Sequence, residues 1–309
     1  MQRHVFPVFL AIASIGLGGA SCGKKSAADP DNGDSKAVVA AIDKATLAEE
    51  SKGPKKDIDG VDLAKLDGSE RKLYDKLVDS LVSPCGKAES LRKSATISKD
   101  CKRSVFAARY VAMLARDGAT EEQAREFYGK RYVDNNPVEI AVGSDVPHVG
   151  PVDAPVVIVE FMDYGCPACK AAKPAIEAAI KLFPSQVVLY YKNYPLVRVH
   201  EHSKMCAQAV VAATKQGKFH EMHDLLFEKQ GAQDKDQLFE YAKQLGLDMT
   251  KFTADFDAAV PAVEADMAQG DQLRLKGTPS FFVNGRRYED LPDPRYFESW
   301  IEEELAVNR

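Results

Sequence analysis

The sequence predicts an α/β domain over residues 137–309 that follows a small all-helical domain over residues 37–136. Two observations support this division. After residue 137, short apolar runs that suit strands alternate with longer segments of helical periodicity, an order typical of α/β folds. Before it, apolar residues recur at helical spacing, and Asn135-Asn136-Pro137 marks the boundary between the two parts.

The composition is that of a soluble globular protein. The chain has 309 residues, of which 45% are hydrophobic and 28% charged. This length allows one large domain or two ordinary ones. The net charge of −5, without a basic stripe, argues against nucleic-acid binding.

The first residues indicate export. A short basic region precedes an apolar run, residues 5–17, that is too short to span a membrane. The small residues of Gly18-Gly19-Ala20-Ser21-Cys22 then resemble the lipobox of bacterial lipoproteins. One position departs from that pattern, because Gly19 stands where the family usually has Leu.

This resemblance implies a signal peptide over residues 1–21 and acylation of Cys22. The alternative is an ordinary cleavage after Ala20, which leaves Cys22 as a plain thiol. In both cases the protein is exported to a periplasm-facing compartment in which disulfides form. Residues 22–36 lack an apolar period and predict a flexible tether that holds the domains near a membrane.

Helices are expected throughout the first domain. Thr120 with Gln123 three residues later forms a capping box, and Asp67-Gly68-Ser69-Glu70 interrupts or caps another helix. Ser83-Pro84-Cys85-Gly86 predicts a turn. The expected helical segments are residues 37–50, 63–81, 87–94, 101–117 and 120–131.

The second domain begins with a strand-like run, residues 138–142, and a polar loop. The near-continuous apolar run at 156–161 suits a central strand buried on both faces. A helix is expected from Pro167, since proline is favourable at the first helical position, with a kink at Pro174. The remaining elements are a strand at 186–191, a mostly helical stretch at 200–275, a hairpin around Asn284-Gly285 and a helix at 294–305.

The six cysteines divide into groups. Cys166 and Cys169 pair naturally with each other, and Cys85 with Cys101 is then the obvious second pair. In an exported protein such a second disulfide contributes roughly 3 kcal/mol of stability, whereas two buried free thiols are the alternative. Cys206 lies on an amphipathic helical stretch and is expected to be a buried small hydrophobe, with a third redox thiol as the alternative.

Cys166-Pro167-Ala168-Cys169 follows the buried run at the point where a helix begins. Unpaired N–H groups and the helix dipole stabilise a thiolate at a helix start, and the thiolate is the species that attacks disulfides. Cys166 is therefore the expected nucleophile. Cys169, about one helical turn further on, is expected to attack the mixed disulfide and release the product.

Two motifs resemble those of DsbA-like proteins, which have a thioredoxin fold with a helical insertion. Glu160-Phe161-Met162-Asp163-Tyr164-Gly165-Cys166-Pro167-Ala168-Cys169 resembles their active-site segment. Gly277-Thr278-Pro279-Ser280-Phe281-Phe282-Val283-Asn284-Gly285 resembles their cis-proline loop. The likeness covers residues 138–307, with the motifs in the family's order. It implies a thiol–disulfide oxidoreductase whose redox group is its own disulfide, without a further cofactor.

The same resemblance implies roles for Pro279, Thr278 and Glu160. A cis Pro279 forms a tight loop facing the dithiol, and the Thr278 backbone pairs with an extended substrate; a plain turn is the alternative. Glu160 interrupts a buried strand, so its pKa is expected to be raised. An acidic residue near this position relays a proton to the second cysteine in the family. The alternative for Glu160 is contact with solvent or a salt bridge with Lys192.

Pro167 and Ala168, which separate the two cysteines, are expected to tune the redox potential. DsbA has a histidine there and a thiolate pKa of about 3.5. Ala168 adds no donor and no positive charge. We therefore expect Cys166 to be acidic, but less so than in DsbA, and the protein to be a milder oxidant. Asp163 is expected to cap the loop rather than to take part in catalysis.

Residues 61–140 resemble the three-helix domain of the CcmH family, which handles apocytochrome c thiols. The likeness lies in residues 81–91 and 117–132. That family has Cys-Pro-x-Cys where this chain has Ser83-Pro84-Cys85-Gly86. The resemblance therefore implies a helical hairpin fold with a structural role, and no thiol chemistry in this domain.

No metal site is expected. His200, His202 and Cys206 do not fall on one helical face. His220 and His223, with Glu221, are expected to lie on the polar face of a helix.

Three functions follow from these patterns. The first is an exported oxidoreductase that forms or exchanges disulfides in cysteine-containing exported proteins, together with a membrane or soluble redox partner. The second is a reductase or isomerase on the same fold, serving for example cytochrome c maturation; an isomerase usually needs a dimer, which the helical domain is able to supply. The third is a peptide-binding module without redox turnover, against which the intact Cys-x-x-Cys and Thr278-Pro279 argue.

Overall fold

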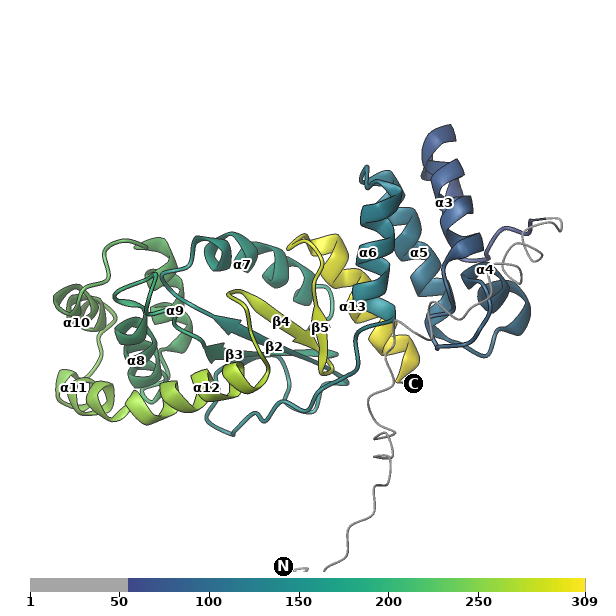
Figure 1. Cartoon of the computed structure of the whole chain (residues 1–309). Helices are drawn as coiled ribbons and strands as arrows, with labels where there is room; N and C mark the ends of the chain where they lie inside the picture. The colour runs from purple at the N-terminus through teal and green to yellow at the C-terminus, as the bar shows by residue number, and fades with distance from the viewer. Residues whose placement is uncertain (1–54, 309) are drawn as a thin grey trace, which may run out of the picture.

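The structure is a computed structural model that describes residues 55–308. The expected signal peptide, Cys22, the tether and the helical segment at 37–50 lie outside these residues. In the described part, a helical N-terminal domain lies beside a larger domain built on a mixed sheet (Figure 1).

Capping boxes begin two helices of the N-terminal domain. The Asp67 side chain accepts from the backbone N–H groups of Ser69 and Glu70, so α3 starts at Gly68. Thr120 and Gln123 make the expected reciprocal pair at the start of α6. The elements are η1 (Leu63–Lys65), α3 (Gly68–Ser80), α4 (Leu91–Lys93), η2 (Ser94–Ser98), α5 (Arg103–Arg116) and α6 (Glu121–Tyr132).

The sheet of the second domain has five strands in the order β1-β3-β2-β4-β5. The central strands β2 and β3 are parallel, and the other neighbours are antiparallel. Both central strands are almost wholly buried, as their apolar runs predict. The strands are β1 (His148–Val149), β2 (Val156–Met162), β3 (Val187–Asn193), β4 (Ser280–Val283) and β5 (Arg286–Tyr288).

The expected strand at residues 138–142 was wrong. This segment is irregular, although the Val138 N–H donates to the Gly285 carbonyl at 2.9 Å. Its side chains Ile140 and Val142 pack against the face of the sheet that carries Val159 and Phe161. The apolar residues of the segment therefore cover the sheet instead of joining it, and the edge strand β1 comes from the expected polar loop.

The opposite face of the sheet is covered by α7 (Pro167–Ile180) and α13 (Pro294–Val307). A helical insertion separates β3 from β4 and packs at one end of the domain (Figure 1). It consists of α8 (Ser203–Thr214), α9 (Phe219–Glu228), α10 (Lys235–Gln244), α11 (Met249–Ala258) and α12 (Val260–Gln272). α7 starts near this insertion and runs toward the helical domain.

A buried ionic cluster joins the two domains. The Glu303 carboxylate, on α13, accepts from Arg131 at 2.9 Å, from Arg286 at 3.1 Å and from Tyr132 at 2.7 Å, and it also pairs with Arg103. Its side chain is fully buried. Arginine and tyrosine from the helical domain therefore share one carboxylate with an arginine of the sheet, and a single hydrophobic core extends through both domains.

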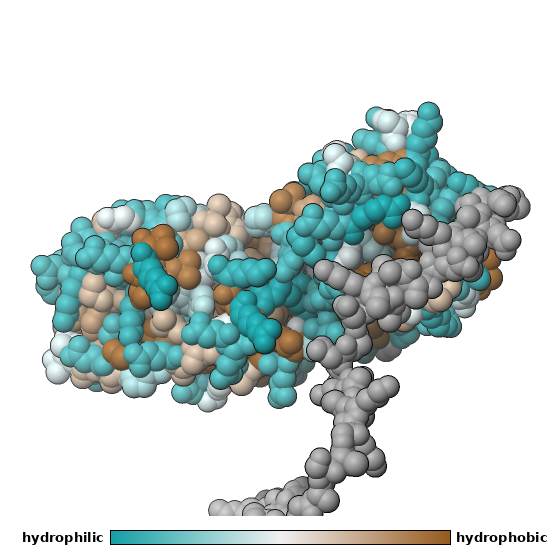
Figure 2. Space-filling view, in the orientation of Figure 1, coloured by the Kyte–Doolittle hydropathy of each residue, from teal (hydrophilic) through white to brown (hydrophobic). Residues whose placement is uncertain are grey.

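The face of the described surface shown in Figure 2 is mainly hydrophilic, with separate small hydrophobic patches. Among residues 55–308, no helix combines the length and the apolar character needed to cross a lipid bilayer.

Candidate active site

The turn from β2 into α7 places the two cysteines. Cys166 is the N-cap residue of α7, in an extended conformation, and Pro167 takes the first helical position. The helix then continues through Pro174 to Ile180. Cys169 lies in the first helical turn on the buried face and is fully buried, whereas Cys166 is 6% exposed. Cys166 is therefore the accessible thiol of the pair, as the motif predicts, although less exposed than a free helix start suggests.

Asp163 holds the loop before Cys166. Its carboxylate accepts from the Gly165 N–H at 2.7 Å and the Leu196 N–H at 2.8 Å, and it contacts the His200 Nδ1 at 2.7 Å. A Cβ at residue 165 would lie 2.6 Å from the Cβ of His200, so only glycine fits there. Asp163 has the structural role expected for it, and His200 is a neighbour of the active-site loop that the sequence did not reveal.

The loop at Thr278-Pro279 faces the dithiol, and its peptide bond is cis. The Cys166 thiol donates to the Thr278 carbonyl at 3.3 Å. The Thr278 hydroxyl is buried and has no hydrogen-bond partner, so it is free to donate to Cys166 when that thiol ionises. A groove of about 620 Å³ extends from this loop along Arg274, Lys276 and Tyr288.

The two thiols have opposite acidities. The thiol of Cys169, the Thr278 side chain and the backbone N–H groups of Cys169 and Ala168 all stabilise the Cys166 thiolate, and they lower the pKa of Cys166 to about 5. The same contact with Cys166, together with burial and the nearby Glu160, raises the pKa of Cys169 far above its usual range. At neutral pH, Cys166 is thus a thiolate and Cys169 a thiol.

Glu160 lies on β2 with its side chain on the face of the sheet that carries Cys169. It is 3% exposed, and burial followed by the charge of Glu177 raises its pKa to about 8. The alternative salt bridge with Lys192 was wrong: Lys192 is opposite Phe161 in the register, on the other face, and its ammonium pairs with Asp266 at 3.0 Å. Glu160 is therefore an uncharged acid at neutral pH.

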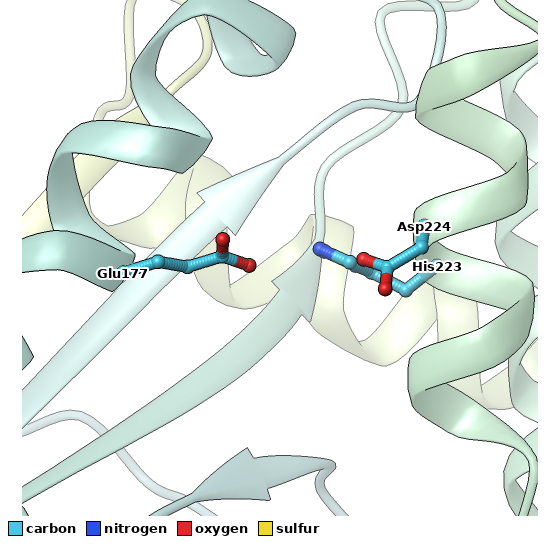
Figure 3. A group of neighbouring side chains, drawn as sticks. All are labelled: Glu177, His223 and Asp224. Carbon is cyan, nitrogen blue, oxygen red and sulfur yellow. The ribbon is translucent and has the colours of Figure 1, made fainter. Parts of the chain in front are cut away.

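A second polar cluster lies between α7 and α9 (Figure 3). The Lys173 ammonium pairs with Glu177 at 2.6 Å and with Asp224 at 2.8 Å. The expectation that His223 lies on a polar face was wrong, because His223 is 3% exposed, whereas His220 is exposed. The ring of His223 packs among Tyr164, Tyr191, Phe219 and Phe227. The helix turns this histidine onto the same stripe as Phe219 and Phe227, four residues away on either side.

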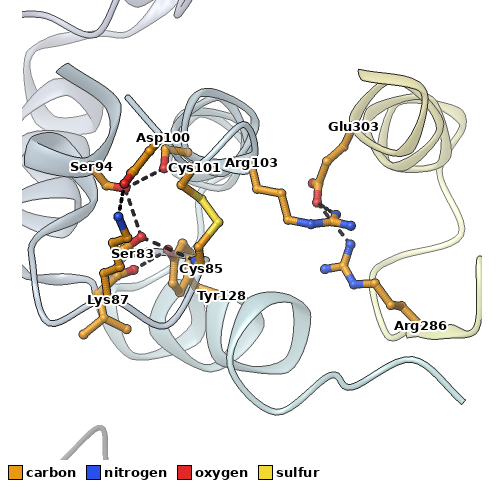
Figure 4. Close-up of a disulfide and its surroundings, with 12 residues drawn as sticks. Ser83, Cys85, Lys87, Ser94, Asp100, Cys101, Arg103, Tyr128, Arg286 and Glu303 are labelled. Carbon is orange, nitrogen blue, oxygen red and sulfur yellow. Dashed lines mark hydrogen bonds and ion pairs between the residues drawn. A yellow bond between two sulfur atoms is a disulfide. The ribbon is translucent and has the colours of Figure 1, made fainter. Parts of the chain in front are cut away.

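A disulfide joins Cys85 to Cys101 in the helical domain, with the Cα atoms 5.9 Å apart (Figure 4). It links the turn after α3 to the segment that leads into α5, so it ties together two parts of the helical hairpin. Arg103, which follows Cys101 closely, points toward Glu303 and the domain junction. Cys206 on α8 is a free thiol, fully buried, and burial raises its pKa to about 12.

The sequence matches the family described as thioredoxin over residues 144–303, about half of the chain. The chain belongs to the thioredoxin family. This match, together with the helical insertion between β3 and β4, confirms the expected thioredoxin fold with a helical insertion.

Curated relatives match about half of this chain. The chain is 40% identical over 153 residues to the Na(+)/H(+) antiporter NhaA 1 of Salinispora arenicola, which covers 48% of this chain and 23% of that protein. It is 32% identical over 183 residues to the Na(+)/H(+) antiporter NhaA of Herminiimonas arsenicoxydans, with coverage of 58% and 29%. The chain thus spans about a quarter of the length of these relatives.

Similar solved structures include a thioredoxin-like oxidoreductase from Silicibacter pomeroyi, with 29% identity, a TM-score of 0.47, and coverage of 52% of this chain and 92% of that one. Another is oxidised BdbD from Bacillus subtilis, with 26% identity, a TM-score of 0.48, and coverage of 55% and 99%. A third is the catalytic domain of ScsC from Proteus mirabilis, with 24% identity, a TM-score of 0.47, and coverage of 53% and 91%.

Proposed function

We propose that the protein is an exported thiol–disulfide oxidoreductase that forms or exchanges disulfides in extracytoplasmic proteins through Cys166 and Cys169. The observation that supports it most is the pairing of an acidic Cys166, with a pKa of about 5, with a fully buried Cys169 whose pKa is raised. In a pair of buried thiols with only a structural role, burial would raise the pKa of both, and no such difference in pKa would be expected.

In the oxidising direction, a substrate thiolate attacks the Sγ of Cys166 in the Cys166–Cys169 disulfide. The S–S bond breaks, a mixed disulfide forms, and the Cys169 sulfur leaves with the electron pair. A second substrate thiolate then attacks the substrate sulfur and expels Cys166. Two substrate thiols have lost two electrons and two protons, and a redox partner must reoxidise the reduced dithiol.

The pKa values of Cys166, Cys169 and Glu160 determine which step of the exchange each residue assists. Cys166 is a good leaving group because its thiolate is stable, so release of the oxidised substrate is fast. Cys169 leaves poorly as a thiolate, and in this proposal Glu160, which its raised pKa keeps protonated at neutral pH, supplies the proton. In the reverse, reducing direction, the same carboxylate accepts that proton before Cys169 attacks.

The thiolate pKa also predicts the redox potential. A lower pKa stabilises the reduced form at pH 7, and thioredoxin, with a pKa of about 7, has a potential of about −270 mV. Lowering that pKa to about 5 stabilises the reduced form by about 2 kcal/mol more, which raises the potential by about 50 mV. The same reasoning from DsbA, with a pKa of about 3.5 and a potential of about −120 mV, gives about −165 mV.

The test is the equilibrium of the Cys166–Cys169 pair with glutathione. We expect a potential between about −220 and −165 mV, more oxidising than thioredoxin and less than DsbA. A potential near that of thioredoxin would contradict the oxidising role and support the alternative, a reductase. An isomerase, the other alternative, would need a dimer, which gel filtration of residues 55–309 would detect.

We also propose that the protein is anchored to a membrane by a lipid on Cys22. The small residues that precede Cys22 support this proposal. In a bacterial host given a labelled fatty acid, the chain should incorporate the label and the Cys22→Ala variant should not. Equal labelling of both chains, or of neither, would contradict the anchor.

A further inference from the structure

Among the residues that the structure describes, Glu177, His223 and Asp224 bring three ligand atoms within 4.8 Å of one another. Figure 3 shows the His223 ring nitrogen directed at the Glu177 carboxylate from the opposite helix, with the Asp224 carboxylate beside it. Glu177 comes from α7, and the other two come from adjacent positions on α9. The cluster is separate from the dithiol and from the Thr278-Pro279 loop.

The decisive feature is the unpartnered nitrogen of His223. Its Nε2 atom is buried and makes no hydrogen bond. The residue as a whole is also buried, so bulk water does not supply a partner. Its Nδ1 lies 3.0 Å from the Tyr164 hydroxyl. When Nδ1–H donates to that hydroxyl, the Nε2 lone pair faces the two carboxylates, which is the tautomer that metal-binding histidines adopt. A buried polar nitrogen without a partner is costly, so its position requires an explanation.

Lys173 accounts for the positions of the two carboxylates but not for the unpartnered nitrogen of His223. Its ammonium pairs with Glu177 and Asp224, so this cluster already holds a positive charge. The ammonium offers no hydrogen bond to His223 in this structure. Burial, followed by the charge of Lys173, lowers the pKa of His223 to about 3, so the imidazole is neutral at physiological pH, as a metal ligand must be.

We propose that Glu177, His223 and Asp224 form a binding site for one divalent transition-metal ion, with Zn²⁺ as the probe. One imidazole and two carboxylates are a donor set that such ions accept, and the three ligands leave a coordination position for water. The donor atoms of a tetrahedral zinc ion lie about 3.4 Å apart, given metal–ligand distances of about 2.1 Å. The carboxylates of Glu177 and Asp224, which are partly exposed and exposed, reach this spacing by rotamer changes as the ion displaces the Lys173 ammonium.

An ion at this position would influence the redox centre. Tyr164, which orients the His223 ring, lies two residues before Cys166 in the active-site loop. After burial, the negative charge of Glu177 contributes most to raising the pKa of Glu160, and a bound cation would offset that charge. The site therefore offers a way for a metal ion to modulate the exchange reaction without contacting either cysteine.

The test is titration of the oxidised protein with Zn²⁺ by isothermal calorimetry. The oxidised form is required because a reduced Cys166–Cys169 pair would itself bind zinc. We expect one ion per chain, and about tenfold or more weaker binding for each of the variants Glu177→Gln, His223→Gln and Asp224→Asn. His220→Gln, an exposed histidine on the same helix, is the matched control and should bind as the parent does.

Lys173→Met distinguishes this proposal from a purely structural ion pair, because it should bind Zn²⁺ more tightly than the parent protein. Asp224 is exposed and Glu177 partly exposed, so their variants remain informative if His223→Gln does not fold. In zinc-soaked crystals, the anomalous peak should lie between α7 and α9. No binding by Lys173→Met, binding unaffected by Glu177→Gln and Asp224→Asn, or a peak elsewhere would overturn the proposal.

Discussion

Replacing Glu160 by Gln should stabilise the reduced protein, and the gain should depend on pH. Burial raises the pKa of Glu160 from 4.5 to about 8, so the folded state holds this proton more tightly than the unfolded state does. The penalty for ionisation is absent well below pH 4.5, grows as the pH rises and levels off above about pH 8.

The size of the effect follows from the two pKa values. Each pKa unit corresponds to about 1.4 kcal/mol, so the gap between 4.5 and about 8 corresponds to about 5 kcal/mol for full ionisation. The same linkage gives a penalty of about 1 kcal/mol at about pH 5 and about 3 kcal/mol at about pH 7. The Gln variant carries no such penalty at any pH.

The assay is urea unfolding of the reduced parent and Glu160→Gln proteins at about pH 5 and about pH 8. Between about pH 5 and about pH 8, the free energy of unfolding of the parent should fall by about 3 to 4 kcal/mol more than that of the variant. The other titrating groups are common to both proteins, so their effects cancel in the comparison. The control is Glu201→Gln at an exposed position. Its free energy of unfolding should depend on pH as that of the parent does. Parallel pH profiles for parent and Glu160→Gln would show that Glu160 has an ordinary pKa and is no proton donor for Cys169.

Three further changes test other parts of the structure. Thr278→Val should raise the pKa of Cys166 by about one unit, because the thiolate loses a hydroxyl donor; a titration of thiolate absorbance that shows no change would contradict this role. Glu303→Gln should lower the free energy of unfolding by about 3 to 5 kcal/mol, since buried arginines lose their carboxylate; a loss below about 1 kcal/mol in chemical denaturation would refute it. Replacing Cys85 and Cys101 by Ser should cost roughly 3 kcal/mol, measured the same way against the parent with this disulfide intact.

The elements that the sequence predicted well depend on local chemistry. The capping boxes at Asp67 and Thr120, the Asn284-Gly285 turn and the start of α7 at Pro167 are each set by residues within one turn of one another. The same is true of the dithiol. The two cysteines of a Cys-x-x-Cys motif at a strand-to-helix junction lie within one helical turn, so local structure sets their relative positions. Such patterns need no knowledge of the rest of the fold.

The features that the sequence did not reveal depend on contacts between distant segments. Residues 138–142 have the alternation of a strand, yet they pack on the face of the sheet because β1 takes the edge position. His223 and Glu177 show no common motif, and they meet only because α9 packs beside α7. The partners of Glu303 are arginines from three separate segments. Each of these arginines, considered in the sequence alone, would be expected on the surface.

The junction around Glu303 has a consequence for how the molecule approaches its substrates. The helical domain contacts α13 through buried charges and a shared core. The N-terminal end of α7 lies toward the helical insertion, where the Gln230 side chain donates to the Cys166 carbonyl at 2.9 Å. The helices α3 and α5 lie at the other end of the molecule (Figure 1). A disulfide-exchange partner therefore meets the reactive sulfur beside the helical insertion, with the helical domain at the far end of the molecule.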